Sequence, residues 1–160
     1  MLVGISFVMA SGCVVNNYLD RGMDAKMKRT KKRALVTGLI STRSAFLYAG
    51  ILGVLGVLTL AYGTNILTAA IGLFGFVAYV VIYGYAKRHS VHSTLVGSIS
   101  GAIPPVVGYT AVTGRLDLNA VFLFLILVSW QMPHFYAISD RKSTRLNSSH
   151  TDISRMPSSA

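Results

Sequence analysis

The sequence predicts an all-α membrane protein with about five membrane-spanning helices. Of its 160 residues 52% are hydrophobic, only 12% are charged, and none is glutamate. A soluble domain carries about 25% charged residues, so this chain has too few to cover a water-facing surface. The single cysteine, Cys13, cannot form an intramolecular disulfide. These observations exclude a soluble globular enzyme, a disordered chain and a disulfide scaffold.

Charged residues divide the chain into apolar segments of membrane-spanning length. The 43 residues from Ser44 to Ala86 carry no charge. As a helix they would extend roughly 64 Å, about twice the ~30 Å hydrocarbon core of a bilayer. The polar, glycine-containing stretch 61–65 therefore separates two helices. Arg115 and Asp117 separate two further uncharged runs, and another run opens the chain. The predicted helices are 1–18, 36–60, 65–86, 93–113 and 118–138.

Two prolines fall inside the fourth of these helices. Pro104 and Pro105 each lack the backbone N–H that a helix uses, so they predict a kink or an interruption there. Glycines recur at three- and four-residue spacing elsewhere, as in 50–56, which favours close packing between membrane helices.

The basic residues indicate the orientation in the membrane. They concentrate in the connections 20–33 and 87–92, which five helices would place on the same side. By the positive-inside rule that side is the cytoplasm, or the matrix in an organelle. The net charge of +10 therefore reflects topology and contact with the lipid bilayer, and it is no evidence for nucleic-acid binding. We expect a multi-pass protein of the cell inner (cytoplasmic) membrane, or of the mitochondrial inner membrane in a eukaryote.

Three oxygen-bearing side chains recur every four residues at the end of the first helix. Asn16, Asp20 and Asp24 would drift by only about 40° per step, so they share one helix face. Such a row suits Mg²⁺, which completes its shell with water and substrate phosphate oxygens. The basic residues of 28–33 would supply positive charge for a diphosphate. In the alternative interpretation, Asp24 and Lys28 form an ordinary i,i+4 ion pair and the loop charges serve only topology.

Several motifs, in order along the chain, resemble one known family. They are ASGCVVNNYLD at 10–20, RT at 29–30, KRHS at 87–90, GSISGAIPPVVGY at 97–109, AVTG at 111–114 and WQMPHFYA at 130–137. Together they cover about residues 1–139. The chain resembles the haem O synthases (protohaem IX farnesyltransferases), a branch of the UbiA-type intramembrane prenyltransferases.

This resemblance implies a bundle of about nine helices, of which this chain contains five. It also implies transfer of a farnesyl group from farnesyl diphosphate to a vinyl group of haem b, which gives haem O for terminal oxidases. Mg²⁺ would be the cofactor, and haem b a substrate rather than a cofactor. Haem A synthase and terminal oxidase assembly factors are candidate partners.

The resemblance also implies roles for individual residues. The metal ligands would be Asn16, Asn17, Asp20 and Asp24, of which Asn17, Asp20 and Asp24 are the candidate catalytic residues. The diphosphate would be bound by Lys28, Arg29 and Arg33, and Lys87 and Arg88, on the same membrane face, would bind the diphosphate or the haem propionates. His89 and His134 are candidates for a haem or substrate pocket. The alternatives are a positive-inside role for the basic pair at 87–88, a solvated position for His89 and His92, and an interhelical hydrogen bond for His134.

Two departures from the family pattern affect these expectations. Gly22 stands where the pattern usually has an acidic residue, which removes one candidate metal ligand. The family's second aspartate-rich motif, expected after the helix that contains His134, is absent. We interpret 1–139 as part of a prenyltransferase membrane domain that begins partway through a longer protein. The polar, serine-rich stretch 140–160 is interpreted as a non-family tail of sequencing or assembly origin, or else as a genuine polar tail without helical periodicity.

Two rival functions follow from the same residues. A UbiA-type enzyme could prenylate a quinone precursor or chlorophyllide, although the segments 87–89 and 130–134 favour haem O synthesis. A non-catalytic membrane subunit would bind ions without a diphosphate. We expect no prenyltransferase activity from the 160 residues alone, because the second aspartate motif would hold a second metal ion.

Overall fold

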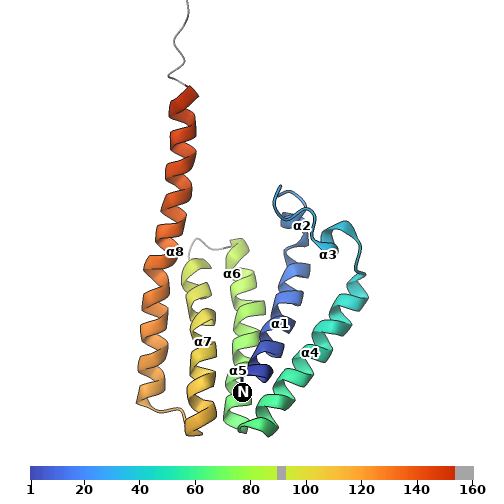
Figure 1. Cartoon of the computed structure of the whole chain (residues 1–160), viewed down its shortest axis with the longest axis vertical. Helices are drawn as coiled ribbons and strands as arrows, with labels where there is room; N and C mark the ends of the chain where they lie inside the picture. Colours follow the sequence, from blue (N-terminus) through green and yellow to red (C-terminus); the bar gives the residue numbers. More distant parts are fainter. Residues whose placement is uncertain (90–92, 154–160) are drawn as a thin grey trace, which may run out of the picture.

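Five helices that are long and apolar enough to cross a membrane lie side by side in the described part of the chain (Figure 1). The computed structural model describes residues 1–89 and 93–153, with side chains as far as Ala137. Those residues form helices and turns but no strand, which confirms the predicted all-α membrane fold. The helices are α1 (Leu2–Leu19), α2 (Arg21–Asp24), α3 (Ala34–Thr37), α4 (Thr42–Gly63), α5 (Ile66–Val77), η1 (Ala78–Tyr83), α6 (Gly84–His89), α7 (Ser93–Thr113) and α8 (Leu118–Ile153).

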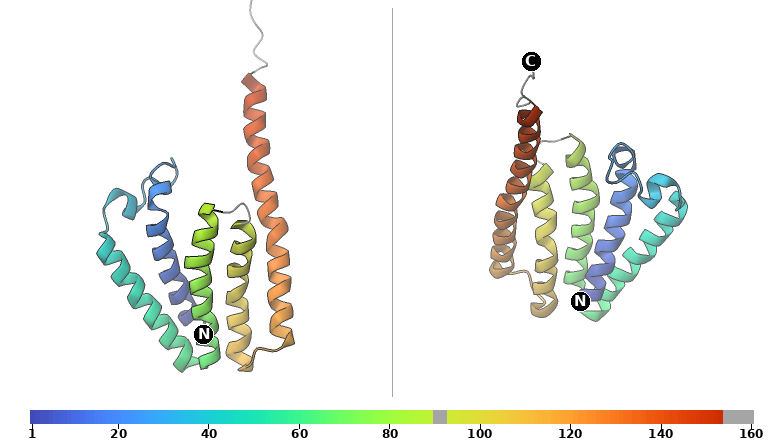
Figure 2. Two further views of the ribbon diagram at one scale, coloured as in Figure 1. Left: turned by 180° about the vertical axis from the view of Figure 1, so that it is seen from behind. Right: turned by 45° about the horizontal axis from the view of Figure 1, so that its top comes forward.

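The third membrane span is built from three consecutive segments. α5, η1 and α6 together form the span Ile66–His89, and η1 in its middle is a π-helix. A π-helix is wider than an α-helix because its hydrogen bonds skip one more residue. In the bundle this span packs beside α1 and α7, with α4 on the far side of α1 and α8 on the far side of α7 (Figures 1 and 2).

The basic loop after α1 and the basic residues 87–89 lie at the same end of the bundle, as predicted from the charge pattern. The loop with α2 and α3 follows α1 at the end where α6 also terminates (Figure 1). Lys87, near the end of α6, forms an ion pair with Asp20, which directly follows α1. The connection 114–117 lies at the opposite end, between α7 and α8 (Figure 1).

The second predicted helix begins later than expected. We predicted its start at residue 36, but the membrane helix α4 begins at Thr42, and a separate single turn, α3, precedes it. Gly38 has a φ of 79°, a left-handed conformation that ends α3. The Ser41 side chain then accepts a hydrogen bond from the backbone N–H of Ser44 and caps the new helix. Local capping chemistry thus decides this boundary, which apolar composition alone did not reveal.

Two other expectations about helix continuity differ from the structure. α7 continues through Pro104 and Pro105, so the interruption expected there is wrong, while the kink stays a prediction. Membrane helices accept such prolines where neighbouring helices cover the freed carbonyl groups, and here the carboxamide of Gln131 on α8 packs against Gly101. α8 also continues as helix to Ile153, although its apolar membrane-spanning part ends at Ala137 as expected. Residues 138–153 contain no glycine or proline that would end a helix.

α1 and α4 pack closely because small residues face each other. A Cβ atom on Gly56 would lie 2.8 Å from the backbone nitrogen of Val8 and 2.9 Å from the carbonyl oxygen of Gly4. Hence only glycine fits at this position without a shift of α1. Membrane helices that meet through small residues gain van der Waals contact between their backbones.

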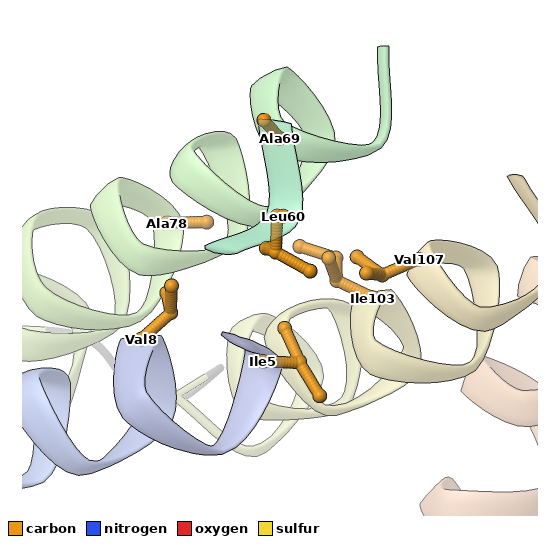
Figure 3. Close-up of a cluster of buried hydrophobic side chains, with 7 residues drawn as sticks. All are labelled: Ile5, Val8, Leu60, Ala69, Ala78, Ile103 and Val107. Atoms are coloured by element: carbon orange, nitrogen blue, oxygen red, sulfur yellow. The ribbon is translucent and has the colours of Figure 1, made fainter. Parts of the chain in front are cut away.

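A cluster of buried apolar side chains joins four of the spans (Figure 3). Ile5 and Val8 come from α1, and Leu60 from α4 is fully buried between them and the third span. The remaining members are Ala69, Ala78, Ile103 and Val107. The third span and α7 also share a buried polar contact, in which Thr68 Oγ1 donates to Thr110 Oγ1 at 3.2 Å.

The connection between α7 and α8 is organised around Asp117. Tyr109 Oη lies 2.9 Å from both carboxylate oxygens, and the backbone N–H groups of Asn119 and Ala120 donate to Oδ1 at 3.1 and 3.2 Å. Partial desolvation acts to raise the pKa of Asp117, but these hydrogen bonds and the nearby Arg115 outweigh it. The pKa of this carboxyl therefore lies below its ordinary value of 3.8.

Candidate functional site

The end of α1 places two of the three polar side chains that the sequence predicted to share one face in direct contact. α1 ends at Leu19 and α2 begins at Arg21. The backbone of Asp20 between them is nearly helical. Asn16 Nδ2 donates to Asp20 Oδ2 at 3.1 Å, which confirms that these two side chains are neighbours. Asp20 and Asp24 are each only 5% exposed. Two carboxylates are therefore buried at the membrane face of the bundle.

Asp20 is held by basic residues from the end of α6. Lys87 Nζ lies 2.6 Å from Asp20 Oδ2, and Arg88 Nη2 lies 3.8 Å from Asp20 Oδ1. The same Arg88 nitrogen donates to the carbonyl oxygen of Leu19 at 2.5 Å. Arg88 thus satisfies one of the free carbonyl groups at the end of α1, as basic side chains often do at helix C-termini.

Asp24 is held by the loop that follows it. Arg33 Nη1 lies 2.6 Å from Asp24 Oδ2 and donates to Asn17 Oδ1 at 3.1 Å. The buried hydroxyl group of Thr30 donates to the carbonyl oxygen of Asp24 at 3.1 Å, so the loop folds back over the end of the helix. Asp24 therefore pairs with Arg33, and the alternative i,i+4 ion pair with Lys28 is wrong for the described chain.

The donor atoms of this group fit a hard divalent cation such as Mg²⁺. Asn16 Oδ1 is buried and has no hydrogen-bond partner among the described residues. An unpaired buried oxygen is unfavourable, and a cation would satisfy it. Two carboxylates and two carboxamides offer oxygen atoms only, the ligand type that Mg²⁺ prefers. No cluster of three or more His, Cys, Asp or Glu residues that could hold a metal ion occurs in the part of the chain that the structure describes.

Four other predicted site residues form no hydrogen bond or ion pair with Asp20 or Asp24 in the described part of the chain. Lys28 and Arg29 are exposed on the loop and form no ion pair with the described residues. His89 is exposed and stacks on Tyr85, with ring centroids 4.5 Å apart. His134 is exposed too, and its ring lies parallel to that of Trp130 at 6.0 Å. The structure therefore does not bring these residues together with Asp20, and His92 lies outside the described residues.

An apolar cavity of about 370 Å³ lies inside the bundle, between α1, the third span, α7 and α8. Gly12 and Cys13 of α1 line it, one turn before Asn16. From the third span it is lined by Tyr79 and Tyr83, which stack with ring centroids 5.7 Å apart. Residue Tyr83 precedes Lys87 by one helical turn. The cavity therefore extends along the same two helices that present the carboxylates and the lysine.

Sequence reasoning did not single out the two cavity tyrosines. The chain contains eight tyrosines and seven phenylalanines, and no motif distinguishes among them. A usable signal was the four-residue spacing of 79, 83 and 87, which places both rings on the helix face of the basic residue. A larger hollow of about 480 Å³ between α1, α4 and α5 has almost only apolar lining and no ionisable side chain, so it offers no comparable chemistry.

The fold and the site together define a polytopic membrane protein with a buried, oxygen-rich carboxylate site at one membrane face, next to an apolar cavity. The sequence matches the UbiA prenyltransferase family over residues 1–155. The chain belongs to this family.

Two of the curated relatives that the chain matches carry the same name. The chain is 57% identical over 139 residues to the protoheme IX farnesyltransferase of Citrobacter koseri. It is 56% identical over 139 residues to the protoheme IX farnesyltransferase of Escherichia coli strain K12. Each match covers 86% of this chain and 47% of the relative, so the chain spans about half the length of the curated relatives it matches. No solved structure matches the chain.

Proposed function

We propose that this chain forms the diphosphate-binding part of a farnesyltransferase that makes haem O. The observation that carries the proposal is the pair of buried carboxylates, Asp20 and Asp24, which lie among basic residues beside an apolar cavity. Farnesyl diphosphate has a matching shape, with a charged head and a long apolar chain. The relatives' shared name, protoheme IX farnesyltransferase, supports haem b as the acceptor.

The polar end of the site would bind the head group. Mg²⁺ bound by Asn16, Asn17, Asp20 and Asp24 would supply positive charge to the diphosphate. Negative charge grows on the leaving diphosphate as its bond to the farnesyl carbon breaks. Arg33, Lys87 and Arg88, with Lys28 and Arg29 from the loop, would therefore stabilise the transition state more than the ground state.

The cavity would hold the farnesyl chain. Its volume of about 370 Å³ is within the usual size range of ligand sites. The electron-rich faces of Tyr79 and Tyr83 would stabilise the allylic cation that forms as diphosphate leaves. A vinyl carbon of haem b then bonds to the cation, and water adds to the resulting haem-side cation with loss of a proton. The product carries a hydroxyethylfarnesyl group. His89 and His134 remain candidates for contact with haem.

The proposal also covers the membrane location, the domain bounds and the partners of the protein. The aspartates and basic loops would lie on the cytoplasmic side of the cell inner membrane, or in the matrix of a mitochondrion, following the positive-inside rule. Residues 1–139 would be part of the prenyltransferase domain and 140–160 a polar tail, although the family match reaches residue 155. Haem A synthase and oxidase assembly factors are the proposed partners.

The test is a full-length chimera in which residues 1–139 replace the matching half of the E. coli relative. Cells that lack their own haem O synthase would express it, and haem O would be measured by chromatography. We expect Asp20→Asn to abolish haem O formation while the protein still inserts into the membrane. Asp117→Asn is the matched control, because it removes a carboxylate at the opposite end of the bundle. Normal haem O levels with Asp20→Asn would overturn the proposal.

A further inference from the structure

Basic side chains already occupy the two carboxylates that would bind the metal. Lys87 Nζ lies 2.6 Å from Asp20 Oδ2, and Arg33 Nη1 lies 2.6 Å from Asp24 Oδ2. Each carboxylate is buried, whereas the side chains of Lys87 and Arg33 are 35% and 42% exposed. The basic groups reach in from the solvent side, so they can leave the carboxylates without crossing the protein interior.

The charges of this cluster do not favour a free divalent cation. Two carboxylates face three basic groups, Lys87, Arg33 and Arg88, which leaves a single excess positive charge. A divalent cation entering alone would add two more positive charges within hydrogen-bonding range of the basic groups. A diphosphate ester that accompanies the metal reverses this, because its negative charge exceeds that of the metal and gives Lys87 and Arg33 new partners.

We infer that Lys87 and Arg33 act as placeholder cations, meaning side chains that neutralise Asp20 and Asp24 until the metal arrives with a diphosphate. On arrival they exchange the carboxylates for diphosphate oxygens, so metal binding and diphosphate binding are coupled. This inference rests on the proposed function and specifies how the same site is controlled. The site stays closed to free cations and opens only to a metal–diphosphate complex.

A placeholder has two opposite effects on the protein. An unpaired carboxylate buried at this site would be strongly unfavourable, so Lys87 stabilises the metal-free chain. The same ion pair competes with the metal for Asp20. Removal of the lysine charge should therefore lower stability and raise the affinity for a free cation, a combination that loss of a merely structural contact would not produce.

The experiment measures Mn²⁺ binding by electron paramagnetic resonance, with the whole 160-residue chain in lipid nanodiscs. Mn²⁺ is titrated alone and with inorganic diphosphate, and bound complexes are separated by ultrafiltration. We expect diphosphate to tighten Mn²⁺ binding by the wild type by about tenfold or more, because a neighbouring charge of opposite sign typically shifts a binding equilibrium by at least that much. Lys87→Met should bind Mn²⁺ alone about tenfold more tightly than the wild type and lose most of this coupling.

Two variants separate the role of Lys87 from general effects. Lys87→Arg keeps the charge and should behave like the wild type. Lys26→Met removes an exposed charge from the neighbouring loop, away from the carboxylates, and should also leave Mn²⁺ binding unchanged. If Lys87→Met does not fold, as judged by circular dichroism, Arg33→Met tests the same prediction at Asp24.

The outcomes distinguish this inference from the proposed function. If the folded Lys87 or Arg33 variant binds Mn²⁺ alone no more tightly than the wild type, the placeholder role is overturned. The proposed function then still stands, provided that Asp20→Asn loses the Mn²⁺–diphosphate complex. If Asp20→Asn retains wild-type binding of that complex, the metal role of the carboxylates fails, and the proposed function fails with it.

Discussion

The hydroxyl group of Ser11 donates a hydrogen bond of 2.7 Å to the carbonyl oxygen of Ala49, and this bond ties the middle of α1 to α4. Ser11 is only 2% exposed, so water cannot replace its partner. The same helix carries Asn16 and ends next to Asp20. The packing of α1 against α4 therefore fixes where the carboxylates lie, so contacts far from the site contribute to its geometry.

A substitution where α4 packs closely against α1 should destabilise the bundle, whereas one elsewhere on α4 should not. Gly56→Ala places a methyl group within 3 Å of the Val8 and Gly4 backbones and should lower the free energy of unfolding by about 1–3 kcal/mol. Gly50→Ala on the same helix meets no atom within 4 Å and should have little effect. Unfolding in mixed micelles followed by circular dichroism measures both. Equal stability of the two variants would contradict the packing argument.

An aspartate at position 22 should change metal binding very little. Gly22 lies two residues from both Asp20 and Asp24, and on a helix such neighbours face away from each other. A Cβ atom at Gly22 meets nothing within 4 Å, so the new side chain would extend into open space. We expect Gly22→Asp to alter the affinity for Mn²⁺ with diphosphate by less than about threefold, since only screened charge acts at that distance. A gain of tenfold would show that this position reaches the metal.

The ring of Tyr79 should matter more than its hydroxyl group. If its face stabilises the farnesyl cation, Tyr79→Phe should keep most of the activity of the chimera, and Tyr79→Leu should lower kcat by roughly tenfold. Phe122→Leu removes a ring from the exposed surface of α8 and serves as the control. Initial rates of haem O formation decide the question. An unchanged kcat with leucine at position 79 would exclude the cation–π role.

The connection between α7 and α8 should make stability depend on pH. The pKa of Asp117 lies below its ordinary value, since its hydrogen bonds favour the charged form despite partial desolvation. This stabilisation is present above the ordinary pKa of about 4 and is lost as the pH falls through the lowered pKa of the folded state. The melting temperature of Asp117→Asn should therefore lie below that of the wild type at pH 7. The two melting temperatures should converge as the pH falls through that lowered pKa, and a constant difference would assign the effect to shape rather than charge.

Charge clustering predicted most of the fold, because a bilayer tolerates few charges within a helix. That constraint located all five spans and placed the two basic connections together. The start of α4 was missed because Gly38 and Ser41 decide it through turn and cap geometry, which hydropathy does not contain. The helical continuation to Ile153 was missed because a polar composition says little about backbone conformation when no helix-breaking residue is present.

The candidate site was predictable where its residues are close in sequence. Asn16 and Asp20 meet because four residues complete about one helical turn. The pairing of Asp20 with Lys87 spans 67 residues, and the sequence indicated only that both lie on the same membrane face. The cavity around Tyr79 and Tyr83 depends on how four helices pack, so their spacing relative to Lys87 indicates a shared helix face but not the cavity.

The π-helical segment η1 sets the phase of the third span. Each residue of a π-helix turns the chain by a smaller angle than in an α-helix, so η1 rotates everything after it relative to α5. If one residue were deleted there, the remaining five could close as regular α-helix with nearly the same total turn, so Lys87 would keep its face. One residue inserted into α6 ahead of Lys87 would instead turn Lys87 by about 100° away from Asp20. A bilayer would accept either length. The length of the regular helix before Lys87 is therefore constrained by rotational alignment as well as by membrane thickness, and single-residue insertions in α6 would separate insertion into the membrane from assembly of the charged cluster.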